Sequence, residues 1–407
     1  MKNSNLIRIF AAMLLICGIS ACSVGDIGSD MLDSSGMGSF DAPGESGPDK
    51  GEDGPGGNSQ AGMVTAGEWN DLENWGFWNG LMDSQNSQKY YEYLEYWSLF
   101  TSERYAVTVL DEDQQPVCGA TVGLHLNGSE KPVWTAITDN QGSAELWYNI
   151  NSSVDTEEVK TFTASVNGII YEEPVVRTSS ISEDVSMNFL TAPQTSVRKS
   201  ADIAFIVDAT GSMGDEIQFL KDDLLDIINK ASAQQSGISL RTAALFYRDE
   251  GDAYVTKYNN FSKDPQKTLK FIKDQSAMGG GDYPEAVHTA LEEALQSLSW
   301  EEGNYARIAF LLLDAPPHYQ PDVTESIRQS IRQYAANGIK LIPVSASGID
   351  KNTEFLLRMM AIFTDGTYVF ITNHSGIGGD HIEPTIGQYQ VELLNSLIVR
   401  LIGKYTE

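Results

Sequence analysis

The sequence contains few basic residues. Its 407 residues include 27 lysines and arginines against 56 aspartates and glutamates, which gives a formal net charge of −29, and no basic cluster interrupts this acidic background. Nucleic-acid binding depends on lysine and arginine side chains that displace counterions from phosphates. The charge balance therefore argues against a nucleic-acid partner and is compatible with a soluble, cation-tolerant surface.

The sequence also lacks the motifs of common enzyme classes. It shows no Ser-His-Asp or Cys-His order, no phosphate-binding lysine loop and no His-Glu-x-x-His. A metal-dependent phosphotransferase with Asp208 as its nucleophile would need a second aspartate two residues later, and Thr210 occupies that position. We therefore expect a protein that is not an enzyme, with a hydrolase as the least favoured alternative.

Apolar runs long enough to cross a membrane are absent. Residues 9–16 form a short apolar core behind Lys2 and Arg8, a pattern typical of an export signal. Ile19-Ser-Ala-Cys22 then resembles a bacterial lipobox, in which cleavage precedes the cysteine and the cysteine carries the lipid.

The lipobox resemblance implies a lipoprotein signal peptide at residues 1–21 and a membrane anchor at Cys22. It implies a cell-envelope lipoprotein of the outer membrane, with the periplasmic and the surface face both open. The alternative is an ordinary secretory peptide cleaved near Ala21.

Cysteine is scarce, with three residues in the whole chain. Cys17 lies in the expected signal peptide and Cys22 would be acylated, so Cys118 is the remaining free thiol. No intramolecular disulfide is therefore expected, although the compartment is oxidising. Cys118 is expected to be buried.

Two segments of unusual composition follow the signal peptide. Residues 22–66 are rich in glycine, serine, proline and aspartate, and they are expected to form a disordered tether because they cannot bury enough apolar surface. Residues 67–103 are rich in aromatic residues. These aromatic side chains could form a platform for sugars or peptides, but packing against a neighbouring domain is favoured.

Residues 104–192 alternate apolar and polar side chains with a period of two, between turn signals such as Asn127-Gly. This pattern predicts a small all-β sandwich. The runs at 113–122 and 138–146 resemble the carboxypeptidase regulatory-type, transthyretin-like sandwich. Modules of that kind usually act as spacers or supports in exported proteins.

Residues 199–407 alternate between strand and helix patterns. This alternation predicts an α/β fold with a doubly wound sheet and helices on both faces. The expected strands are 202–207, 239–246, 253–258, 306–313, 339–345 and 367–371. The expected helices are 214–231, 264–275, 284–298, 321–337, 351–362 and 386–402.

The first of these strands ends in a group of oxygen-bearing side chains. Asp208 follows the apolar run 203–207, and Thr210 and Ser212 stand at alternate positions after it. Open α/β sheets bind ligands at the carboxyl ends of their strands. Carboxylate and hydroxyl oxygens suit magnesium, manganese or calcium. The alternative is a helix cap formed by Ser212 or Asp215 without a metal.

Two later stretches present further carboxylates. Gly279-Gly-Gly-Asp-Tyr-Pro-Glu285 is a glycine-rich loop before a helical pattern, and Leu311-Leu-Leu-Asp-Ala-Pro-Pro-His318 is a buried-strand pattern that ends in an aspartate. With Asp-x-Thr-x-Ser at 208–212, the three loops resemble the metal-ion-dependent adhesion site of the von Willebrand factor type A family. The second and third loops are most similar to the integrin beta-subunit version.

The resemblance implies a doubly wound, Rossmann-like domain with Mg²⁺ or Mn²⁺ at these loops. Thr210 and Ser212 would bind the ion directly, while Asp208 and Asp314 would hold its waters and hydroxyls. Glu285 is the candidate for the direct carboxylate. Other family members place a threonine in the second loop, and its absence here leaves Asp282 as the alternative.

An adjacent Ca²⁺ site is implied at Asp215 and Glu216 by the same resemblance. The alternative is that these acidic residues only stabilise the first turn of a helix.

We expect a membrane-anchored, divalent-metal-dependent protein-binding module of adhesion type in the bacterial envelope. Its partner would be a protein that presents a carboxylate to the open coordination position. The alternative is a structural component of an envelope or surface assembly, with a purely structural metal.

Overall fold

The computed structural model describes residues 62–152, 160–178, 187–234, 237–375 and 381–406. The expected signal peptide, Cys22 and most of the expected tether lie outside the described residues. A search of the described helices finds no segment with the length and apolar character needed to cross a membrane.

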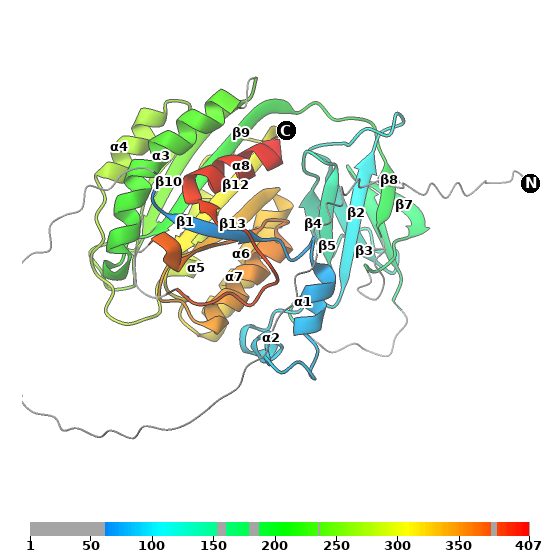
Figure 1. The fold of residues 1–407 in the computed structure, drawn as a ribbon. Coiled ribbons are helices and arrows are strands. Elements are labelled where there is room, and N and C mark those ends of the chain that lie inside the picture. Colours follow the sequence, from blue (N-terminus) through cyan, green and yellow to red (C-terminus); the bar gives the residue numbers. More distant parts are fainter. Residues whose placement is uncertain (1–61, 153–159, 179–186, 235–236, 376–380, 407) are drawn as a thin grey trace, which may run out of the picture. The chain divides into compact units, whose positions relative to one another are not determined.

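The largest sheet in the described part of the chain has eight strands in the order β11-β10-β9-β12-β13-β14-β1-β15. Figure 1 labels β10, β9, β12, β13 and β1 of this sheet. The five strands from β10 to β14 in this order run parallel, and β11 pairs antiparallel with β10 at one edge. The predicted α/β class with a doubly wound sheet is confirmed, and the sheet is mixed because β11 and β1 pair antiparallel with their neighbours. The bounds of the eight strands are β11 (Thr256–Ser262), β10 (Ser239–Tyr247), β9 (Arg198–Asp208), β12 (Asn304–Leu313), β13 (Ile339–Ser345), β14 (Tyr368–Ile371), β1 (Thr65–Trp69) and β15 (Glu392–Leu393).

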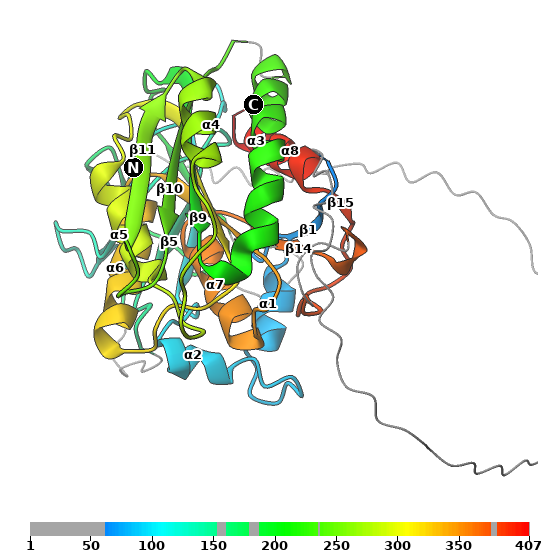
Figure 2. The same ribbon diagram turned by 90° about the vertical axis from the view of Figure 1, so that its left-hand side faces the viewer.

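Helices cover both faces of this sheet. Figure 2 shows α3 and α8 on one side and α5 and α6 on the other. Alternate residues of β9 explain the two layers, because Phe205 and Val207 join the core under α3 and α8, whereas Ala204 and Ile206 join the core under α5, α6 and α7. The helices are α3 (Gly214–Gln234), α4 (Pro265–Lys273), α5 (Val287–Ser297), α6 (Pro321–Ala336), α7 (Lys351–Phe363) and α8 (Leu394–Thr406).

Strand β1 comes from the N-terminal part of the chain. It pairs antiparallel with β14, where Ala66 faces Ile371, and with β15, where Thr65 faces Leu393. The sequence predicted that Thr65 and Ala66 belong to the tether, because two residues are too few to show the alternation of a strand. A domain boundary at Lys199 would leave this strand outside its own sheet.

The last helix begins later than expected. The sequence predicted a helix over 386–402, but α8 covers Leu394–Thr406. Gly387 explains part of the difference, because it packs so closely on Trp69 that a Cβ atom would lie 2.6 Å from that ring. The segment before α8 therefore follows the surface of Trp69 rather than a helical path.

The aromatic segment packs inward, as predicted. It contains α1 (Trp75–Leu81) and α2 (Glu92–Trp97), and Trp78 stacks on Phe355 of α7 with ring centroids 5.9 Å apart. The buried side chains include Trp75, Trp78, Tyr90, Trp97 and Phe100.

The residues between the aromatic segment and β9 in the sequence form two smaller sheets. One has the order β5-β2-β8 and the other β4-β3-β6-β7. Pairing is antiparallel except between β2 and β8, and the pattern of alternation missed β7 and β8. Their bounds are β2 (Arg104–Leu110), β3 (Thr121–Leu126), β4 (Trp134–Ile137), β5 (Ser143–Trp147), β6 (Phe162–Val166), β7 (Ile169–Pro174) and β8 (Asn188–Thr191). Cys118 is buried beside this segment, as expected.

Candidate metal centre

Asp208 is the last residue of β9 and organises the turn that follows it. Its Oδ1 atom accepts hydrogen bonds from the backbone N–H of Thr210 at 2.9 Å and from the Thr210 hydroxyl at 2.7 Å. The Thr210 and Ser212 hydroxyl oxygens lie 3.4 Å apart. The three oxygen-bearing side chains of the first loop therefore meet at the end of the strand, as the sequence predicted.

The glycine-rich loop brings Glu285 to the same place. The backbone N–H of Gly211 donates to the carbonyl of Gly279 at 3.1 Å, which ties the first loop to the second. At Gly280 a Cβ atom would lie 2.9 Å from Glu285 Oε1 and 3.1 Å from Thr210 Cβ, and the backbone has a φ of +69°. Glycine is therefore needed here both for the backbone conformation and for the close approach of Glu285 and Thr210 to the backbone of Gly280.

The third loop anchors Glu285 from the other side. The Glu285 backbone N–H donates to the carbonyl of Pro316 at 2.9 Å, and Glu285 forms an isolated parallel bridge with Pro317. Asp314 lies at the end of β12, is 5% exposed and receives a hydrogen bond from Ser212. The loops after β9, before α5 and after β12 thus place Asp208, Glu285 and Asp314 in one neighbourhood.

The electrostatics of this neighbourhood are unfavourable without a cation. Burial, followed by the Asp314 carboxylate, raises the pKa of Asp208 to about 7. Burial, followed by the surrounding carboxylates with Asp208 first, raises the pKa of Glu285 to about 9. Burial raises the pKa of Asp314 to about 6, against the Ser212 hydrogen bond. Each group is thus held where its charged form is disfavoured.

The same carboxylates carry buried oxygens without a hydrogen-bond partner within the described residues. These atoms are Asp208 Oδ2, Glu285 Oε2 and Asp314 Oδ1. A buried polar atom without a partner is costly, and a divalent cation together with its bound waters would supply partners for these oxygens and offset the repulsion between the carboxylates. The donor set of carboxylates and hydroxyls suits a hard ion, so the residues present fit Mg²⁺ or Mn²⁺.

Within the described ranges, no three His, Cys, Asp or Glu side chains lie close enough to hold one ion by themselves. The fit thus includes the hydroxyls of Thr210 and Ser212 as well as carboxylates.

The remaining predicted site residues, Asp282, Asp215 and Glu216, differ in their surroundings. Asp282 is exposed, in contrast to Glu285, which is 3% exposed. The side chain of Asp215 lies outside the described set. Glu216 is buried, accepts a hydrogen bond from the Ser347 hydroxyl at 2.9 Å and keeps its Oε2 without a partner in the described part of the chain.

Sequence reasoning missed two carboxylates in the turn between β10 and β11. Asp249 Oδ1 lies 2.7 Å from His318 Nε2, and Asp252 accepts a hydrogen bond from the Gly280 backbone N–H at 3.0 Å. Both contribute to the raised pKa of Glu285. Their signal was an acidic turn directly after a buried strand, the same signal that identified Asp208.

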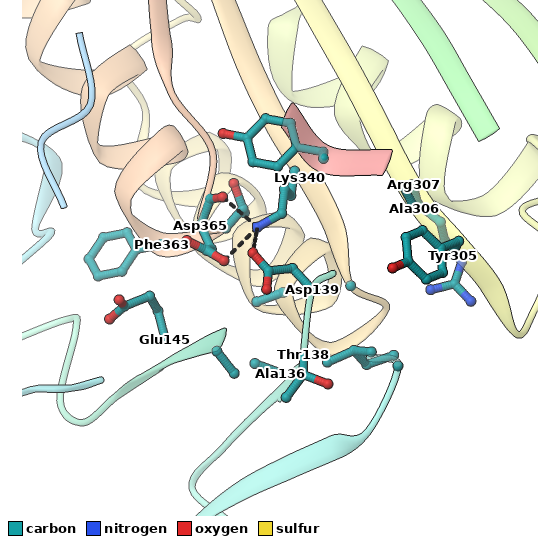
Figure 3. Close-up of a pocket in the computed structure, with 17 residues that line it drawn as sticks. Ala136, Thr138, Asp139, Glu145, Tyr305, Ala306, Arg307, Lys340, Phe363 and Asp365 are labelled. Atoms are coloured by element: carbon teal, nitrogen blue, oxygen red, sulfur yellow. Dashed lines mark hydrogen bonds and ion pairs between the residues drawn. The ribbon is translucent and has the colours of Figure 1, made fainter. Parts of the chain in front are cut away.

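A second buried polar cluster lies between the smaller sheets and the large sheet (Figure 3). Lys340 Nζ lies 2.5 Å from Asp365 Oδ2 and 3.4 Å from Asp139 Oδ2. The cavity beside it has a volume of about 40 Å³. That space suits a few waters at most, so this cluster joins elements rather than binding a ligand.

Comparison with known proteins supports the domain assignment. Residues 202–354 match the family model of the von Willebrand factor A domain. The chain is 29% identical over 130 residues to the ariadne-like RING finger protein R811 of Acanthamoeba polyphaga mimivirus, and 28% identical over 156 residues to the alpha-protein kinase vwkA of Dictyostelium discoideum. These matches cover 32% and 38% of this chain but only 12% and 24% of the relatives.

Among solved structures, the crystal structure of the conserved hypothetical protein BatB from Bacteroides thetaiotaomicron matches 50% of this chain and 98% of its own. The sequence identity is 13% and the TM-score is 0.35.

The fold is an α/β domain with a mixed, doubly wound sheet, and carboxylates and hydroxyls gather at the ends of its strands. Within this α/β class, residues 202–354 are a von Willebrand factor A domain inside a longer chain.

Proposed function

We propose that this protein is a divalent-metal-dependent protein-binding module of adhesion type. The observation that carries the proposal is a set of three buried carboxylate oxygens that have no hydrogen-bond partner among the described residues, beside two hydroxyls, in the loops after β9, before α5 and after β12. The domain assignment is compatible with an interaction module. Metal dependence is inferred from the chemistry of these side chains.

Each side chain has a separate task in this proposal. Thr210 and Ser212 would hold Mg²⁺ or Mn²⁺ through their hydroxyls, and Glu285 would hold it through its carboxylate. Asp208 fixes the Thr210 hydroxyl at 2.7 Å, and Asp314 does the same for Ser212, so both act as positioning residues. When bound, the ion supplies a positive centre for a carboxylate of a protein partner.

The site charge limits the affinity for that partner. A carboxylate that binds the ion directly lowers the residual positive charge and weakens the attraction for an acidic ligand. With Glu285 as a direct ligand and Asp249 and Asp252 close by, we expect modest affinity for an isolated carboxylate. The partner would need further contacts on the surface around the site.

Thermal unfolding with and without a metal tests the proposal. An ion that binds only the folded state stabilises by about 2.7 kcal/mol when its free concentration is 100 times Kd. For a domain of this size, about 1 kcal/mol shifts Tm by about 2–4 °C. We expect Mg²⁺ or Mn²⁺ to raise Tm by several degrees and Asp208→Ala to abolish the rise.

Asp113→Ala serves as the matched control, because Asp113 is exposed in a turn of the smaller sheets. That variant should keep the full metal-dependent rise. If none of Mg²⁺, Mn²⁺ and Ca²⁺ changes Tm, the proposed metal dependence is wrong.

A purely structural metal is the second candidate, favoured by the burial of Glu285 and Asp314. The two candidates differ in what a chelator does to a protein partner. For an adhesion module, chelation should release the partner at a temperature where the domain stays folded. For a structural component, the partner should remain bound until the domain unfolds.

We also propose a non-enzymatic role, an adjacent Ca²⁺ site near Glu216 and anchoring to the outer membrane through Cys22. Glu216 Oε2, which has no hydrogen-bond partner within the described ranges, supports the Ca²⁺ site. The lipobox-like Ile19-Ser-Ala-Cys22 supports the anchor.

A further inference from the structure

A large open groove lies where β1 and α8 meet the segment before β15. Its volume is about 750 Å³, within the usual range of ligand sites. It is lined by Glu68, Trp69, Gln388, Tyr389, Gln390 and Arg400, with other polar residues around them. None of these residues belongs to the candidate metal centre.

The charged side chains of the groove are paired with one another. Glu73 contacts Lys404 at 2.7 Å, Lys404 contacts Glu68 at 4.0 Å, Glu68 contacts Arg400 at 2.8 Å, and Arg400 contacts Glu392 at 2.6 Å. The result is a chain of alternating charges that fixes donors and acceptors along the wall. Three carboxylates face two cations, so most of the charge cancels and the one net negative charge disfavours a phosphate.

The groove also offers unpaired amides and aromatic rings. Gln388 and Gln390 are exposed, and neither side chain has a hydrogen-bond partner among the described residues. Tyr389 is half-buried and is braced edge-to-face by Phe370, with ring centroids 4.9 Å apart. The Trp69 indole N–H is already taken by Asp71 at 3.0 Å, so Trp69 contributes ring surface only.

We propose that this groove binds a neutral oligosaccharide. Sugar hydroxyls donate and accept hydrogen bonds, which matches a wall of fixed carboxylates, guanidinium and amides. The C–H face of a sugar ring packs on aromatic side chains such as Tyr389. A peptide would favour an apolar centre, and the apolar lining of this groove is limited to Trp69 and Tyr389.

Calorimetric titration of the mature full-length protein with chitohexaose and cellohexaose, both in chelator, tests the groove separately from the metal centre. At least one hexasaccharide should bind, and added Mg²⁺ should leave its Kd unchanged. The double variant Gln388→Ala, Gln390→Ala should raise Kd by at least about tenfold, since each lost hydrogen bond is expected to cost about three- to tenfold.

Tyr389→Ala should weaken binding similarly, with its fold checked by circular dichroism. Gln333→Ala on the exposed face of α6 is the matched control and should bind like the parent protein. No heat from either sugar at about 10 mM would overturn the proposal. Equal binding by the double glutamine variant would overturn it too, as would binding of a flexible Gly-Ser peptide in place of both sugars.

Discussion

Glu285 is the residue whose surroundings differ most from those of an ordinary surface carboxylate. It is buried, approaches Thr210 across Gly280 and keeps Oε2 without a partner among the described residues. Asp282, three residues earlier, is exposed in the same loop. The sequence left both as alternatives for the direct ligand, and the structure adds that Glu285 is buried whereas Asp282 is exposed.

The two carboxylates can be compared by substitution. Glu285→Ala should remove most of the metal-dependent rise in Tm, because it deletes a buried candidate ligand. Asp282→Ala should leave most of that rise in place. Calorimetric Mg²⁺ titration of both variants measures the difference, and the reverse order would assign the role to Asp282.

The raised pKa of Glu285 predicts a pH dependence of stability. Its pKa of about 9 exceeds the ordinary value of 4.5, so the metal-free folded protein holds this proton more tightly than the unfolded chain. The stabilisation is complete below about pH 4.5 and is lost as the pH rises toward 9. In chelator, Tm should therefore fall between pH 5.5 and 8.5, a range of about three units inside that window.

Magnesium should oppose this fall, because the ion replaces the proton at the carboxylates. The Mg²⁺-dependent rise in Tm should therefore grow with pH. Glu285→Gln is the matched control and should reduce the slope in chelator, with the remaining slope due to the raised pKa values of Asp208 and Asp314. Parallel pH profiles with and without Mg²⁺ would contradict the linkage.

At the scale of elements, the N-terminal segment is part of the large domain's core. Arg358 of α7 makes a two-pronged contact with Asp71, at 2.6 and 2.9 Å, and also donates to the carbonyl of Thr385 at 2.6 Å. Both ionic side chains are almost fully buried. This contact joins the chain after β1 to α7 and to the segment before α8.

Removing one partner of that pair should be strongly destabilising. Asp71→Ala would leave the buried Arg358 charge with Glu354, 3.7 Å away, as its remaining carboxylate partner. Breaking a buried ion pair typically costs about 3–5 kcal/mol. Glu73 lies two residues after Asp71 and forms an exposed ion pair with Lys404. Glu73→Ala should therefore cost less than about 1 kcal/mol. Urea unfolding of the two variants makes the comparison, and similar losses would mean that the Asp71 contact is not structural.

At the scale of the whole molecule, the anchor is the main prediction. Cys22→Ser should move the protein from the membrane fraction into the soluble fraction, because the variant lacks the cysteine that would carry the lipid. Cys118→Ser is the matched control, since that thiol is buried and remote from the expected cleavage site. Mass spectrometry of the N-terminal peptide checks the acylation, and a membrane-bound Cys22→Ser protein without lipid would refute the anchor.

The sequence alone determined the features that repeat or that lie close together in the chain. Strand and helix periods predicted the doubly wound fold, because burial on alternate sides leaves a local pattern. The spacing of Asp208, Thr210 and Ser212 predicted one loop of the site, since these residues share one turn. The buried aromatic segment was also predictable from its composition.

Only the tertiary structure decided features that join distant segments. The pairing of β1 with β14 and β15 depends on residues about 300 positions apart, and two of its residues looked like tether. Asp249 and Asp252 reach Glu285 only because the turn after β10 folds beside the glycine-rich loop. The choice between Asp282 and Glu285 depends on burial, which a loop sequence without a period does not encode.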